Sequence, residues 1–203
     1  MATSEIQQLI IKSIAKGMTY KAFRAMVKTM AQNGQTSGTK QDENRIHYTR
    51  LNDKRMDRLD KTIGIPAEAA EKIRAYNKKV TWLVLNESWC GDAAQTLPVI
   101  NKAAALNGHI DIKIALRDEN EALMDAFLTD GSRAIPKLIM VNNDTKEVLH
   151  SWGPKPSRAM KMANEYKRIH GKLTPEFRQE LQVWYNKDKG KNTLEDLLEL
   201  LQS

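Results

Sequence analysis

A short, almost entirely apolar segment near the middle of the chain constrains the fold more than any other feature. Residues 80–85, Val-Thr-Trp-Leu-Val-Leu, form a β-branched run that suits a strand buried in a sheet. Strand-like and helix-like segments alternate after it, which favours an α/β layer architecture. Further strands are expected at 110–114, 137–141 and 147–152, with helices ending near 107–108 and covering 119–127.

Residues 1–79 are predicted to be helical. Thr19 can cap a helix that stops at Asn33-Gly34, because a hydroxyl accepts from free helical N–H groups and glycine tolerates the left-handed end. A long charged helix is expected over 42–62 and a shorter one over 67–76. Their apolar stripes are narrow, so we expect this extension to pack on the rest of the chain and not to form a separate core.

Helices are expected again toward the C-terminus. One covers residues 157–170, and Thr174 with Pro175 begins a second. Asn192 is predicted to cap a third, with Glu195 as its capping-box partner. We therefore divide the chain into a helical N-terminal extension, a core domain and C-terminal helices, at 1–79, 80–170 and 171–203.

The net charge of +7 is unevenly distributed. Residues 1–79 carry 16 basic and 8 acidic side chains, residues 80–150 carry 6 and 10, and residues 151–203 carry 10 and 7. In the extension, acids and bases are interleaved at helical spacing, which favours a solvated helical face packed on the acidic middle segment. We expect no nucleic-acid partner.

Length, composition and hydropathy favour a soluble protein over a membrane-spanning one. A chain of 203 residues with 41% hydrophobic and 28% charged residues is typical of soluble globular proteins. No apolar run reaches the roughly 18–20 residues that a membrane helix needs. The first residues, Met1 to Glu5, lack the charged-then-apolar order of a signal peptide. We therefore expect a cytoplasmic protein with no membrane partner.

Cys90 is the only cysteine. A single cysteine excludes an internal disulfide and a zinc site built mainly on sulfur, and the four histidines are scattered, so we expect no metal and no cofactor. Cys90 stands where the apolar strand gives way to a helix. Free backbone N–H groups and the helix dipole would favour its thiolate there, so we expect an exposed thiol with a lowered pKa. A buried structural cysteine is the alternative.

A second motif lies 46 residues after Cys90, where Ile135-Pro136 stands immediately before a strand. Together with Trp89-Cys90-Gly91, this pair resembles the thioredoxin superfamily over residues 78–170. The resemblance implies a thioredoxin-like fold, with a central mixed sheet, helices on both faces, and extra helices at each end. It also implies a cis bond before Pro136, close to the sulfur.

More closely, the chain is similar to bacterial thioredoxin-like proteins that have a helical N-terminal extension, a Trp-Cys-Gly-Asp motif and a Leu-Arg-Asp-Glu-Asn segment, here at 116–120. Two positions depart from the redox pattern. Ala93 stands where a dithiol thioredoxin has its resolving cysteine, and Val84 stands where a buried acid assists that cysteine. Such a chain either uses one thiol with an outside partner or has given up redox chemistry.

The resemblance assigns roles around the motif. Cys90 would be the nucleophile that attacks a disulfide, and an external thiol would release the mixed disulfide. The backbone of Ile135 would pair with an extended peptide, and Pro136 would keep a metal or a second strand from closing over the sulfur. Trp89, beside Gly91, would be a partly exposed apolar wall.

Three charged residues near the motifs have two interpretations each. Asp92 suits the first turn of a helix because of the dipole, but its charge would oppose thiolate formation at Cys90. Arg133 and Arg117 could offset that charge or bind an acidic substrate group. Solvated surface positions are the alternative for both arginines.

We therefore expect a single-cysteine thioredoxin-like protein that exchanges thiols and disulfides through a mixed disulfide at Cys90, with protein or low-molecular-weight thiols as partners. A thioredoxin-fold binding or scaffold module without turnover is the alternative. Monothiol glutaredoxin-type cluster binding is disfavoured, because the motif reads Cys-Gly-Asp-Ala and not Cys-Gly-Phe-Ser. The Pro and Thr that precede a peroxiredoxin cysteine are also absent.

Overall fold

The computed structural model describes residues 3–202, so Met1 and Ala2 of the segment examined for a signal peptide lie outside it. Its centre is a four-stranded sheet in the order β2-β1-β3-β4. β1 runs parallel to β2 and antiparallel to β3, and β3 runs antiparallel to β4. The mixed sheet and all four expected strands are confirmed: β1 Val80–Asn86, β2 Ile110–Leu116, β3 Lys137–Asn142 and β4 Val148–Trp152.

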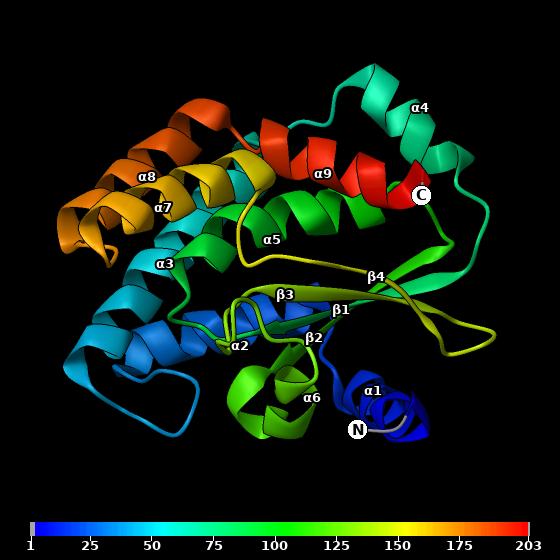
Figure 1. The fold of residues 1–203 in the computed structure, drawn as a ribbon, viewed down its shortest axis with the longest axis horizontal. Coiled ribbons are helices and arrows are strands. Elements are labelled where there is room, and N and C mark those ends of the chain that lie inside the picture. The colour runs from blue at the N-terminus through cyan, green and yellow to red at the C-terminus, as the bar shows by residue number, and fades with distance from the viewer. Residues whose placement is uncertain (1–2, 203) are drawn as a thin grey trace.

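Helices cover both faces of this sheet (Figure 1). One face carries α4 (Ala67–Ala75), α5 (Gly91–Ala104), α7 (Ser157–His170), α8 (Pro175–Asp188) and α9 (Lys191–Gln202). The other face carries α1 (Thr3–Lys16), α2 (Tyr20–Asn33) and α6 (Glu121–Asp125). The long helix α3 (Glu43–Thr62) packs against both α2 and α5 and so joins the two layers. This is the expected α/β fold with extra helices at both ends.

β1 is central because both of its faces are covered. All seven of its residues are buried, as the apolar run predicts, whereas the outer strand β4 is mostly half-buried or exposed. The core around β1 continues into the terminal helices through Phe23 of α2, Met56 of α3 and Leu197 of α9. The segments at both ends of the chain therefore share apolar contacts with the sheet.

Several helix ends follow the local sequence signals. The Thr19 hydroxyl accepts from the backbone N–H of Ala22, and Gly34 ends α2 in the left-handed conformation at φ 66°. The Thr174 hydroxyl likewise accepts from the backbone N–H of Phe177 at the start of α8. These predicted caps are confirmed.

The predicted cap at Asn192 was wrong. α9 begins at Lys191, and the Asn192 side chain accepts from the backbone N–H of Arg158 at 2.8 Å and donates to Ser157 Oγ at 3.0 Å. Glu195 accepts from the Asn192 side-chain amide and not from its backbone. The residues that hold Asn192 lie 34 and 35 positions earlier, so no local pattern could reveal this arrangement.

The helix expected over 119–127 is broken into a 3-10 turn, Arg117–Glu119, and the short helix α6. Asn120 separates them, because its side-chain amide donates to the carbonyl of Leu116 while its Oδ1 accepts from Ser13 of α1. The helix expected to end near 107–108 stops instead at Ala104.

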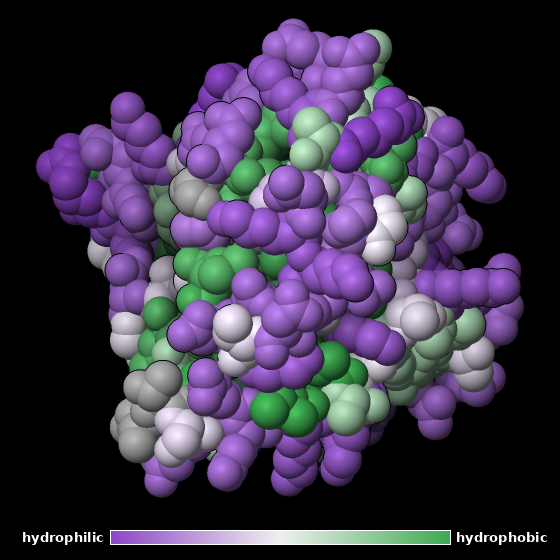
Figure 2. Space-filling model, turned by 90° about the vertical axis from the view of Figure 1, so that its right-hand side faces the viewer, coloured by the Kyte–Doolittle hydropathy of each residue, from purple (hydrophilic) through white to green (hydrophobic). Residues whose placement is uncertain are grey.

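The surface is mostly hydrophilic on the face shown in Figure 2, with small hydrophobic patches between the polar side chains. No helix within residues 3–202 is long and apolar enough to cross a membrane.

Replacing Phe23 by alanine should destabilise the whole chain, because this side chain is fully buried in the shared core. We expect a loss of about 3–5 kcal/mol in the free energy of unfolding. All four tryptophans lie after residue 79, so tryptophan fluorescence during urea unfolding reports on the core domain and C-terminal helices.

The matched control is Ile11→Ala, whose side chain is 47% exposed and whose loss should change stability by less than about 0.5 kcal/mol. An unchanged fluorescence midpoint in the Phe23 variant would mean that the N-terminal helices unfold separately from the sheet.

Candidate functional site

The Trp-Cys-Gly-Asp motif forms the connection between β1 and α5. β1 ends at Asn86 and α5 begins at Gly91, which leaves Cys90 as the N-cap residue of the helix. The peptide bond between Ile135 and Pro136 is cis, and the Cys90 thiol donates to the carbonyl oxygen of Ile135 at 3.3 Å. The structure thus brings the two sequence motifs together.

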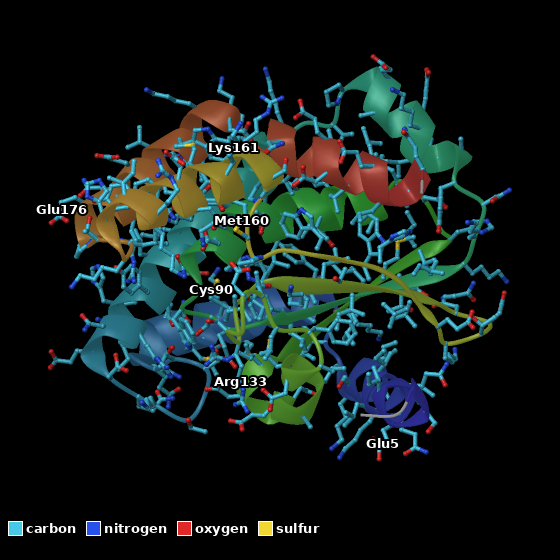
Figure 3. All side chains as sticks on the ribbon, viewed as in Figure 1. Glu5, Cys90, Arg133, Met160, Lys161 and Glu176 are labelled. Carbon is cyan, nitrogen blue, oxygen red and sulfur yellow. The ribbon has the colours of Figure 1, made fainter. Side chains whose placement is uncertain are left out.

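Cys90 is buried, so the expectation of an exposed thiol was wrong. Only 6% of the residue is accessible, and Figure 3 shows it inside the molecule between the helices and the sheet. Burial, together with a smaller contribution from the negative charge of Asp92, raises the pKa of Cys90 to about 12. The backbone N–H groups of Ala93 and Asp92 lower the pKa, as expected at a helix start, but desolvation outweighs them.

Asp92 is held by side chains from two C-terminal segments. Its carboxylate accepts from Lys155 Nζ at 2.7 Å, just before α7, and from the Tyr185 hydroxyl of α8 at 2.8 Å. Tyr185 is buried, and desolvation together with the Asp92 charge raises its pKa well above the ordinary value. Neither partner could be found from the local sequence, because they lie 63 and 93 residues from Asp92.

Two helices reach over Gly91. A Cβ atom built at this glycine would lie 3.5 Å from Nε2 of Gln182 in α8 and 3.6 Å from Nη1 of Arg55 in α3. The Gln182 side chain also accepts from the Gln95 amide of α5 at 3.0 Å. Helices from the N-terminal and C-terminal parts of the chain therefore lie beside the residue that follows the cysteine.

Ser88 ties the cysteine loop to the N-terminal extension. Its hydroxyl lies 2.8 Å from the Thr49 hydroxyl and accepts from the backbone N–H of Ser37 at 2.9 Å. Asn52 of α3 donates to the Ser88 carbonyl at 3.0 Å. All four residues are buried, so the network is shielded from water and fixes the loop against α3.

Glu87 makes a second link to the extension. Its carboxylate accepts a very short hydrogen bond from the Ser37 hydroxyl and another from the backbone N–H of Asp118 at 2.9 Å. Burial raises the pKa of Glu87. Gly38 allows the loop to approach this closely, since its φ is +84° and a Cβ there would lie 2.5 Å from Asp118 Oδ2.

Trp89 is half-buried and its ring is covered by cations. The guanidinium carbons of Arg45 and Arg117 lie 4.5 Å and 5.0 Å from the ring centroid, within the range of cation–π attraction. Trp89 also packs against the core. The part of this side chain that was expected to form an apolar wall is thus engaged by arginines of the same chain.

The two arginines considered near Asp92 have other partners. Arg133 lies beside α6 (Figure 3) and pairs with Asp125 at 2.6 Å and Glu121 at 3.0 Å. Arg117 pairs with Asp118 at 2.6 Å. The charge of Asp92 is offset by Lys155 instead.

The positions that depart from the redox pattern are both packed into the interior. Val84 is fully buried in β1, and Ala93 is buried in the first turn of α5. Within residues 3–202, no three His, Cys, Asp or Glu side chains are grouped so as to hold a metal ion.

This sheet order, with a cysteine at the start of α5 beside a cis proline, defines a thioredoxin-fold protein. A family model described as Thioredoxin matches residues 38–167, and the chain belongs to the thioredoxin family. The match begins at Gly38, within the N-terminal extension.

Two solved structures share the whole fold. A protein of unknown function from Pseudomonas aeruginosa has a TM-score of 0.64 at 17% identity, covering 100% of this chain and 98% of that one. An HIV epitope scaffold has a TM-score of 0.62 at 15% identity, again covering 100% of this chain and 98% of that one. No curated protein matches the sequence.

The raised pKa of Cys90 should make stability fall at alkaline pH. A thiol in the unfolded chain titrates near 8.5, whereas the folded pKa is about 12. Between these values the unfolded chain has lost a proton that the folded chain keeps, so the free energy of unfolding decreases as pH rises.

Cys90→Ser removes this titration, so its stability should change less with pH. We expect the wild-type free energy of unfolding to drop by about 2 kcal/mol relative to the variant between pH 8 and pH 10, measured by urea unfolding. The subtraction cancels the tyrosines and lysines that titrate in both proteins. Parallel pH profiles would contradict a raised pKa at Cys90.

Proposed function

We propose that this thioredoxin-family chain is a binding module without thiol–disulfide turnover, in which Cys90 has a structural role. The observation that carries the proposal is the closed environment of the thiol. Cys90 is 6% accessible, and helices from both ends of the chain lie beside Gly91 and Asp92, the two residues that follow it.

The protonation state of Cys90 supports a role without thiol–disulfide turnover. The thiolate is the species that attacks a disulfide. With the pKa of Cys90 raised to about 12, the thiol stays protonated at pH 7 in nearly every molecule. The fixed charge of Asp92 acts in the same direction as burial.

Substrate access leads to the same conclusion. A peptide disulfide bound beside Pro136 would pair with the backbone of Ile135. The Ile135 carbonyl instead accepts from the Cys90 thiol itself. The thiol therefore shares the acceptor that a peptide substrate would use.

The second candidate is thiol–disulfide exchange through a mixed disulfide at Cys90, resolved by an external protein or low-molecular-weight thiol. It is favoured by the place of Cys90 at the start of α5, where backbone N–H groups lower its pKa, and by the neighbouring cis bond. Exchange would require the loop before α7 and the end of α8 to move away from Asp92, because Lys155 and Tyr185 hold that residue.

Reaction with glutathione disulfide separates the two candidates. The folded protein at pH 7.5 should show no glutathione adduct by intact mass spectrometry, because the thiol is buried and protonated. The same protein in denaturing urea should form one adduct, which proves that the reagent is competent. Cys90→Ser is the matched negative control and should show none in either condition. Rapid adduct formation by the folded protein would reject the binding module and support thiol–disulfide exchange.

A further inference from the structure

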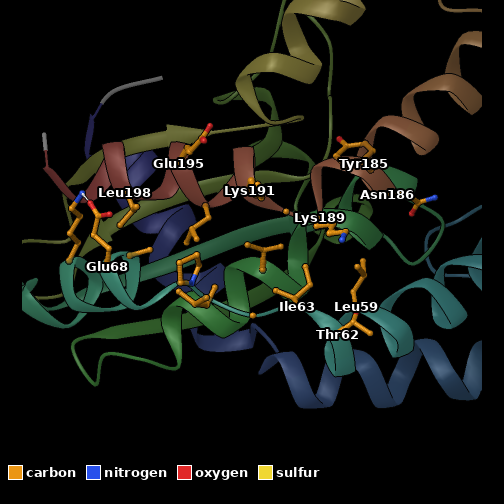
Figure 4. Close-up of a pocket in the computed structure, with 18 of the residues that line it drawn as sticks. Leu59, Thr62, Ile63, Glu68, Tyr185, Asn186, Lys189, Lys191, Glu195 and Leu198 are labelled. Atoms are coloured by element: carbon orange, nitrogen blue, oxygen red, sulfur yellow. Dashed lines mark hydrogen bonds and ion pairs between the residues drawn. The ribbon is translucent and has the colours of Figure 1, made fainter.

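A pocket with a volume of about 810 Å³ lies apart from the cysteine, between α3 and α4 on one side and α5, α8 and α9 on the other (Figure 4). This volume is in the range of pockets that enclose one small organic ligand. Tyr185, which holds Asp92, is also one of the lining residues. The pocket shares α3, α5 and α8 with the thiol site, and its lining adds residues of α4 and α9.

The interior of the pocket is apolar. Aliphatic side chains from four segments form its walls: Leu59, Ile63, Ile65, Val99, Leu194 and Leu198. The turn between α8 and α9 closes against this surface, because a Cβ at Gly190 would lie 2.6 Å from Val99 Cγ2. Gly190 also has a φ of +78°, so the chain can make this turn only with a residue that tolerates the left-handed region.

The charged groups around the pocket are predominantly basic. Its lining contains four cationic side chains but two carboxylates. Both carboxylates are already paired, Glu68 with Lys72 at 2.7 Å and Glu195 with Arg158 at 3.0 Å. The charge that is left unpaired around the pocket is therefore positive.

Three cations supply this charge: Arg58, Lys189 and Lys191. All three are exposed, and none forms an ion pair with a carboxylate in the part of the chain that the structure describes. Arg58 donates instead to the side-chain oxygen of Asn186 at 2.7 Å. Figure 4 shows Asn186 and Lys189 toward one end of the pocket and Glu68 at the other.

We propose that this pocket binds an amphipathic carboxylate, with its apolar chain between the aliphatic walls and its head group at Arg58 and Lys189. The planar guanidinium matches a carboxylate with two parallel hydrogen bonds, and the neighbouring lysines add attraction. An apolar chain gains affinity for every methylene removed from water. This inference deepens the proposed binding function, on which it rests, by naming the class of ligand.

Isothermal titration calorimetry with three ten-carbon probes tests the proposal. Decanoate should bind, decanol should bind at least about tenfold more weakly because it lacks the charge, and decyltrimethylammonium should not bind. Octanoate should bind about tenfold more weakly than decanoate, because two methylenes fewer are buried. Equal affinity for the three head groups, or no binding of decanoate, would overturn the proposal.

Two variants locate the binding site. Leu198→Trp should fill the pocket and abolish decanoate binding, while Val183→Trp, an exposed position of α8 outside the pocket, should not.

Arg58→Glu should weaken decanoate binding by about tenfold or more. Lys61→Glu, an exposed neighbour on α3 that does not line the pocket, should leave decanoate binding unchanged. Because Arg58 is exposed, the comparison of Arg58→Glu with Lys61→Glu remains informative even where Leu198→Trp fails to fold. Unchanged affinity in Arg58→Glu would overturn the assignment of the head group.

Binding of decanoate and reactivity of the Cys90 thiol can be tested independently. Cys90→Ser should bind decanoate with wild-type affinity, since Cys90 does not line the pocket. Loss of decanoate binding with an unreactive thiol would reject the ligand alone. Decanoate binding by a protein that forms glutathione adducts would reject the structural role of Cys90 alone.

Discussion

The carboxylate of Asp92 is the contact on which the arrangement of the cysteine region depends. It stands in the first turn of α5, two residues after Cys90, and receives hydrogen bonds from Lys155 and Tyr185. Lys155 lies in the loop before α7 and Tyr185 lies near the end of α8, so one side chain ties two C-terminal segments to the start of α5. An aspartate at a helix N-terminus is ordinary for dipole reasons. Here its position also places a fixed negative charge beside the thiol.

The opposite side of the cysteine loop is closed by the N-terminal extension. Ser88 and Glu87 form buried hydrogen bonds with Ser37, Thr49 and residues nearby, and α3 packs along α5. Closure from both sides removes water from the sulfur, and desolvation then determines its protonation state. The helix start still lowers the pKa, but it acts on a thiol that has lost its solvent. The strand-to-helix motif that favours a thiolate at an exposed cysteine therefore holds a protonated thiol here.

The strands and most helix ends could be predicted from local patterns, because the apolar run at 80–85 and caps such as Thr19 act over a few residues. The family resemblance rested on two short motifs and gave the fold, and the structure brings those motifs together at Cys90 and Ile135. The burial of Cys90 could not be predicted. Tyr185 and the other residues that surround Gly91 and Asp92 lie far along the chain, and no local pattern indicates which helix will cover a loop. The misassigned cap at Asn192 has the same cause.

The rate at which iodoacetamide labels Cys90 measures how far the thiol is covered and protonated. At pH 7 the account predicts labelling about a thousandfold slower in the folded protein than in urea, because the folded thiol is rarely ionised and is covered by helices. Tyr185→Phe, which removes one bond to Asp92, should accelerate labelling, whereas Tyr166→Phe, whose hydroxyl contacts Thr174 instead, should not. Labelling of the folded wild type as fast as the unfolded chain, with a midpoint below pH 8, would contradict the account.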